Sequence, residues 1–144
     1  MPTSTFPQTK KSLLKKLINL DLENSDITRK VCLGILNYVA SADAETLKKI
    51  TFKDLYNCTG RLNETGIIVA IQYLTDYRIA LLELKFEFTD GAFTVEISHD
   101  DVHSLRETGE FKHPLTGENV IDPESKIVMF FGLGVNGLEV AHNS

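Results

Sequence analysis

Three groups of residues in this chain have types and spacings that would suit chemistry, and the first is a glycine pattern. Gly132-Leu133-Gly134-Val135-Asn136-Gly137 is a literal G-x-G-x-x-G that follows an apolar run. In dinucleotide-binding proteins this pattern leads into a helix whose N-terminus takes the pyrophosphate, within a β–α–β unit. Only seven residues follow Gly137, so neither that helix nor a second strand fits. We therefore expect a flexible ending or a tight turn here, and no cofactor.

The second group is a set of histidines. His99 and His103 stand four residues apart, as metal-binding pairs on one helix face do, and His113 follows ten residues later. Asp100 would add an oxygen ligand, but a zinc peptidase motif places a glutamate at that position. Acidic residues in a first helical turn are also what the helix dipole favours. The pattern indicates surface histidines and no metal site.

The third group is the pair of cysteines, Cys32 and Cys58. Both stand in apolar helical patterns with no histidine nearby in the sequence, which favours buried structural thiols over nucleophiles. Their spacing forms neither a metal motif nor a disulfide framework, so we expect a reducing, cytoplasmic setting. None of the three groups predicts an enzyme.

The apolar periodicity predicts helices, then a β-hairpin, then a mixed segment. The expected helices and caps are Lys10–Leu22, Ile27 to about Ala40 after Asp26, a short turn after Asp43, Phe52–Cys58 after Thr51, and Asn63 to about Tyr77. The expected hairpin is Leu81–Ser98, with its turn at Thr89-Asp90-Gly91. Ser98 and Asp101 then open a further helix. Ile127–Phe131, which is apolar throughout, is expected to be a strand buried on both faces.

Length and composition fit one domain of ordinary size. The 144 residues are 42% hydrophobic and 24% charged, which is typical of a globular protein. Neither an internal repeat nor a linker interrupts residues 10–144, so we expect a single α+β domain after a flexible arm at 1–9. The chain has no run of about 18 apolar residues, so no membrane span is expected.

Helix, helix, turn, helix and hairpin in this order resembles the winged-helix superfamily over residues 27–98. The resemblance is architectural. It implies a winged-helix-like core at 27–98, with a basic N-terminal helix before it and a helix–loop–strand extension at 99–144 after it. In that superfamily the helix before the hairpin is usually the recognition helix, here Asn63–Tyr77, and the hairpin is the wing. The resemblance therefore implies a DNA-binding transcriptional regulator.

The charge pattern argues against that function. The expected recognition helix contains Glu64 and Asp76 and no lysine or arginine. Residues 83–124 hold eleven acids against three bases, whereas a DNA-binding surface needs bases for phosphate. Two segments are basic: the first twenty residues, with four lysines and no acid, and residues 29–61, with six bases against three acids. If the chain binds DNA, the residues expected to carry it are Lys48, Lys49, Lys53, Arg61, Asn63 and Thr65.

The expected helix 63–77 is apolar on nearly every side, which favours an interaction surface. Its inward stripe would be Ile67, Ala70, Ile71 and Leu74, and its outward residues would be Ile68, Val69, Gln72 and Tyr73. The outward residues either contact a protein partner or a second copy, or are covered by Ile127–Phe131 of the same chain. The sequence thus predicts a non-catalytic regulatory or adaptor protein that acts through protein–protein contacts, with homodimerisation as one form. DNA binding of the winged-helix type is the alternative.

Phe111–Glu118 is the least generic loop. Phe111, His113 and Leu115 are expected to anchor it, while Pro114 and Gly117 shape its turns. Both a functional loop and a structural bridge to the last strand stay open.

Overall fold

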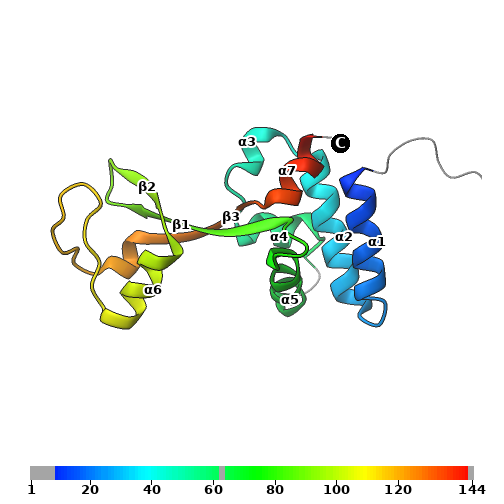
Figure 1. Ribbon diagram of the computed structural model, residues 1–144, viewed down its shortest axis with the longest axis horizontal. Helices are drawn as coiled ribbons and strands as arrows, with labels where there is room; N and C mark the ends of the chain where they lie inside the picture. Colours follow the sequence, from blue (N-terminus) through cyan, green and yellow to red (C-terminus); the bar gives the residue numbers. More distant parts are fainter. Residues whose placement is uncertain (1–8, 62–63, 143–144) are drawn as a thin grey trace, which may run out of the picture. The chain divides into compact units, whose positions relative to one another are not determined.

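The computed structural model describes residues 9–61 and 64–142, and these divide into two compact units (Figure 1). The first, called the helical unit, comprises the described residues up to Glu83 and those from Phe131 onward. The second, called the hairpin unit, comprises Leu84–Phe130. The described residues form seven α-helices and a three-stranded antiparallel sheet, which confirms the predicted α+β class. None of the helices in these ranges has the length and hydropathy that a membrane span requires.

The helical unit is built around α2. Its helices are α1 (Lys10–Asp21), α2 (Asp26–Ser41), α3 (Ala44–Leu47), α4 (Phe52–Cys58), α5 (Glu64–Thr75) and α7 (Val135–His142). Helix α2 packs against α1, α4, α5 and α7. Its apolar stripe supplies five fully buried residues to the core: Val31, Cys32, Ile35, Leu36 and Val39. Burial of this stripe holds four other helices around one axis.

Side-chain caps set the starts of several helices. Thr51 accepts a hydrogen bond from the backbone N–H of Asp54 (3.1 Å), and the Asp54 carboxylate accepts one from that of Thr51 (3.0 Å), which completes a capping box for α4. Asp26, predicted as the cap of α2, is instead its first helical residue and binds Arg29 at 2.8 Å. The prediction was wrong by one position because a carboxylate in the first turn also suits the helix dipole. Asn63, predicted as the cap of α5, lies outside the described residues.

The hairpin unit contains most of a β-hairpin and one helix. Its elements are β2 (Thr94–Ile97), α6 (His99–Thr108), the 3-10 turn η1 (Pro123–Lys126) and the larger parts of β1 (Leu82–Thr89) and β3 (Ile127–Leu133). The predicted hairpin is confirmed, with β1 and β2 antiparallel and Phe86 opposite Ile97. Six residues form its core: Phe86, Phe88, Ile97, Val102, Leu105 and Phe111. The inward faces of the hairpin and of α6 therefore make a separate small core.

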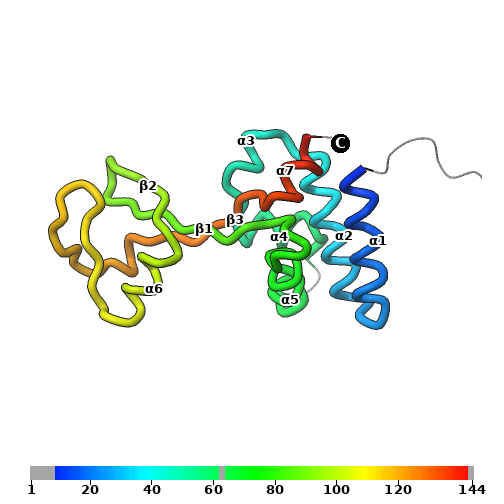
Figure 2. Tube along the Cα trace, in the orientation of Figure 1, coloured from blue at the N-terminus to red at the C-terminus, as the bar shows by residue number. Residues whose placement is uncertain are grey.

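The chain passes between the units twice, within β1 on the way out and within β3 on the way back (Figure 2). The sheet order is β2-β1-β3. In the helical unit, Ile50 and Phe131 exchange both backbone hydrogen bonds, each at 2.8 Å. Most of the hairpin thus belongs to the same compact unit as α6 and the loop that follows it. The sequence had instead predicted one winged-helix-like core of the hairpin and the helices within residues 27–98.

Strand β3 is not buried on both faces along its whole length, as its composition predicted. Phe130 and Phe131 are buried, but Val128 and Met129 are 45% and 51% exposed. Successive residues of a strand point to opposite faces, so exposure of both means that neither face is covered there. The prediction was wrong because β3 lies at an edge of the sheet, where an apolar residue need not be enclosed.

Candidate functional site

The G-x-G-x-x-G pattern has a structural role in the helical unit. Helix α7 begins within the pattern, at Val135, so the expected flexible ending or tight turn was wrong. The backbone N–H of Gly134 donates to Leu81 O (3.0 Å), and that of Gly137 donates to Ala80 O (3.2 Å). A Cβ atom at Gly134 would collide with the Ala80 carbonyl, and one at Gly137 with the Leu81 carbonyl. The glycines therefore let the start of α7 close on residues 80–81, and these amides bind the chain's own carbonyls where a dinucleotide site would bind pyrophosphate.

His99 and His103 do not form a shared site on α6. A ring nitrogen of His99 lies 2.7 Å from the Leu84 carbonyl oxygen, and the His99 and Phe86 rings form a T-shaped pair. His103 lies 3.1 Å from the Glu107 carboxylate on the same helix. Among the described residues no group of three or more histidine, cysteine or acidic side chains is placed to hold a metal.

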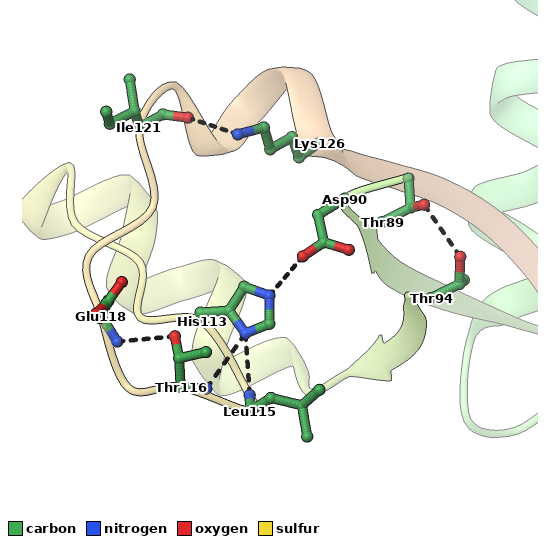
Figure 3. Close-up of polar contacts among 9 residues, drawn as sticks. All are labelled: Thr89, Asp90, Thr94, His113, Leu115, Thr116, Glu118, Ile121 and Lys126. Atoms are coloured by element: carbon green, nitrogen blue, oxygen red, sulfur yellow. Dashed lines mark hydrogen bonds and ion pairs between the residues drawn. The ribbon is translucent and has the colours of Figure 1, made fainter. Parts of the chain in front are cut away.

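His113 forms the tightest polar cluster of the hairpin unit (Figure 3). Its Nε2 lies 2.6 Å from the Asp90 carboxylate, and its Nδ1 accepts hydrogen bonds from the backbone N–H groups of Leu115 (3.1 Å) and Thr116 (3.4 Å). Because Nδ1 is an acceptor, the ring proton is assigned to Nε2, which donates to Asp90. This hydrogen bond holds the pKa of Asp90 below its usual value. The His113 ring also stacks on Phe93 at 5.5 Å between centroids.

This arrangement fastens a loop and engages both ring nitrogens of His113 in hydrogen bonds. The loop closes on itself through His113 N–H to Glu118 O and Val120 N–H to Phe111 O, both 2.8 Å. Phe111 is buried in the core of the hairpin unit. Leu115, predicted as a third anchor, is 70% exposed, because the backbone of this residue binds His113 while its side chain points away. The geometry favours the structural interpretation of the loop.

Both cysteines lie in environments that suppress the thiolate. Burial raises the pKa of Cys32 to about 12. Burial, together with the negative charge of Asp54, raises the pKa of Cys58 to about 11, and the Cys58 Sγ lies 3.3 Å from the Leu55 carbonyl. A thiol of raised pKa is a poor nucleophile at neutral pH, so the surroundings of both residues suit structural thiols.

The outward face of α5 is open. Ile67, Ala70 and Leu74 are fully buried, as predicted, while Ile68 and Val69 are 50% and 45% exposed. Gln72 is also exposed. We call Ile68, Val69, Gln72 and Tyr73 the α5 surface. The sequence left open that Ile127–Phe131 covers this surface. Within that segment, Phe131 belongs to the helical unit, where its backbone pairs with that of Ile50.

Tyr73 differs from the rest of the α5 surface because it is tied to α1. Its hydroxyl donates a 2.7 Å hydrogen bond to Asp21, the last residue of α1. Burial first, and then this carboxylate, raise the pKa of Tyr73. Tyr73 thus joins two helices at the border of the surface, a role that its side-chain type alone did not reveal.

Of the residues predicted for DNA binding, Lys48 and Lys49 follow α3, Lys53 lies in α4, Arg61 follows α4, and Thr65 lies in the first turn of α5. Lys48, Lys49, Lys53, Arg61 and Thr65 are all exposed, and Asn63 lies outside the described residues. Lys48 and Arg61 have partners on their own segments. Lys48 binds Glu45 at 2.8 Å, and the Arg61 Nε donates to the Asn57 side chain at 2.9 Å. The pairing with Glu45 cancels part of the positive field that phosphate contacts require.

Comparisons of this chain with protein-family models, with curated proteins and with solved structures found no match.

Proposed function

We propose that this chain is a non-catalytic regulatory or adaptor protein that acts through protein–protein contacts at the α5 surface. Exposure of Ile68 and Val69 in the middle of that helix carries the proposal. Both belong to a run of apolar residues on a helix whose opposite side is already buried. Apolar residues that adjoin one another on a surface mark sites of association more often than scattered ones do.

Polar groups accompany the apolar residues of the α5 surface. Tyr73 is held by Asp21 at the edge of the surface, and the exposed Gln72 adds a donor and an acceptor to it. An apolar centre with a polar margin is the usual composition of a protein interface. The partner is another protein or a second copy of this chain.

The test is the substitution Ile68→Glu together with Val69→Glu, followed by light scattering after size-exclusion chromatography. We expect the variant to lose self-association, or to lose a protein that co-purifies with the original chain, while its circular dichroism is unchanged. Ile27→Glu on α2 is the matched control, because Ile27 is 57% exposed outside this surface. A variant that unfolds would show that Ile68 and Val69 belong to the core, and equal effects of both substitutions would contradict the proposed surface.

A DNA-binding regulator of the winged-helix type is the second candidate. The order of α2, α4 and α5 before β1 supports it, and so does the exposed cationic group on α4 and its flanks. In this candidate the duplex is contacted by Lys53, Arg61, Asn63 and Thr65, with Lys48 and Lys49 on phosphates. Lys53→Ala combined with Arg61→Ala should then abolish a DNA-shifted elution peak at low salt. Binding that weakens steeply with salt would favour this candidate over the first.

A further inference from the structure

In the hairpin unit, part of β3 has an open backbone edge. Phe131 uses both its N–H and its C=O on Ile50, so these groups face away from β1. Along a strand the backbone groups of every second residue face the same edge, which places those of Met129 on that edge too. Within the described ranges, Met129 has no backbone partner there. The strand therefore offers an unpaired donor and an unpaired acceptor.

This edge is apolar and unprotected. Ile127–Phe130 contains neither a charge nor a proline, and Val128 and Met129 are about half exposed on opposite faces. Natural proteins usually protect an edge strand with charged residues, prolines, bulges or a covering segment. An edge without these features is a template for another strand.

A groove of about 320 Å³ lies beside the edge. Helix α6 lines it with Val102, Leu105 and Arg106, and β3 lines it with Ile127 and Met129. An open strand edge next to an apolar groove is the arrangement that proteins use to bind extended peptides by strand addition. Backbone hydrogen bonds then supply affinity, and the groove selects a side chain.

The charge of the hairpin unit indicates the partner. Residues 84–130 hold four lysines and arginines against ten aspartates and glutamates, a net charge of −6. A second copy presenting the same unit would be repelled, whereas a segment with lysines or arginines would be attracted. Glu124 lines the groove and forms no ion pair within the described part of the chain, so it is open to a cation. We propose that an extended segment of a basic partner protein adds to β3 as a fourth strand and places an apolar side chain in the groove.

The probes for this proposal are four fluorescent eight-residue peptides that alternate lysine with leucine, isoleucine, valine or phenylalanine. Their anisotropy is measured on the full chain. For the tightest peptide, one control replaces the lysines with glutamates. Two further control peptides carry N-methyl groups on every second residue, the first on the odd and the second on the even positions, and we call these the two frames. Each frame therefore lacks the N–H donors of one edge of the peptide. We expect one frame to lose about tenfold or more in affinity and the other to retain it, because only one edge of the peptide pairs with β3.

Two protein variants locate the peptide. Met129→Lys should weaken binding by about tenfold or more, because it adds a cation and removes apolar surface at the edge. Leu115→Lys adds the same charge at a 70% exposed position of the same unit and should change affinity by about twofold or less. Circular dichroism of both variants checks that they fold.

Four results would overturn the proposal. The first is that none of the four peptides binds, and the second is that the two N-methyl frames lose the same affinity or none. The third is that the glutamate peptide binds with the same affinity as the lysine peptide. The fourth is that Met129→Lys and Leu115→Lys change the affinity equally. A chain that is already a dimer, and that Met129→Lys converts to a monomer, would show instead that a second copy occupies the edge.

Discussion

Replacing Gly137 with alanine should loosen α7 from the helical unit. The added Cβ would collide with the Leu81 carbonyl, a backbone atom that no side-chain rotation can move away. Relief then requires a shift of α7, which weakens the bonds from Gly134 N–H to Leu81 O and from Gly137 N–H to Ala80 O. Val140, fully buried on α7, moves with it.

The substitution changes the free energy of unfolding in two opposite ways, and the destabilising contributions are larger than the stabilising one. Overpacking against a rigid neighbour costs about 1–3 kcal/mol, and each weakened hydrogen bond costs about 1 kcal/mol. Alanine is favoured over glycine inside a helix by about 1 kcal/mol. The net expectation is a loss of about 3 kcal/mol in the free energy of unfolding, which for a chain of this size lowers Tm by roughly 10 °C.

Urea unfolding followed by circular dichroism measures this loss. The matched control is Gly34→Ala in α2, where the nearest atom to the new Cβ is a Thr59 methyl carbon at an ordinary 3.5 Å. This control gains helix propensity without a clash, so its stability should be unchanged or higher by up to about 1 kcal/mol. If Gly137→Ala lies within about 0.5 kcal/mol of the original chain, close packing at residues 80–81 does not explain the glycine pattern.

Three further predictions concern single groups. Tyr73→Phe removes the hydrogen bond to Asp21 and should lower the free energy of unfolding by about 1 kcal/mol in urea titrations; no change would mean that water replaces the bond without loss. Asp90 has a lowered pKa in the folded chain, so the stability that it contributes is present above its ordinary pKa and is lost as the pH falls through the lowered value. Asp90→Asn should therefore reduce the acid sensitivity of stability, and parallel pH profiles of the two chains would contradict this. At pH 8 a pKa of about 11 leaves on the order of one thiolate in a thousand, so Cys58 should react with a disulfide reagent at least about tenfold more slowly in the folded chain than in urea. Equal rates would refute the burial argument.

Local patterns in the sequence predicted local structure well. Thr51 was enough to place the start of α4, and Thr89-Asp90-Gly91 with its flanking alternation was enough to place the β1–β2 hairpin. Each of these signals depends on contacts within a few residues, for which the chain's own spacing fixes the geometry.

Features that depend on distant partners could not be predicted. Helix α7 is ordered by the carbonyls of residues 79–81, which lie more than fifty positions earlier, and Ala80 itself has a positive φ of 43° that nothing in its type suggests. The bond between His113 and Asp90 joins residues 23 positions apart, and Asp90 looked like an ordinary turn residue. The sequence left open whether Ile68 and Val69 are exposed or are covered by another part of the chain. Periodicity identifies a second apolar face of a helix but does not show what packs on it.

Because the chain crosses between its units twice, the whole hairpin unit is synthesised before the helical unit is complete. Residues 84–130 are contiguous and complete their own core as soon as they leave the ribosome, whereas the helical unit lacks Phe131 and α7 until afterwards. At ordinary rates of translation the intervening segment takes roughly 2–9 s. During that interval the pairing position of Ile50 and the carbonyls of residues 80–81 have no partner from the C-terminal segment. The helical unit therefore stays incomplete until Phe131 and α7 have been synthesised.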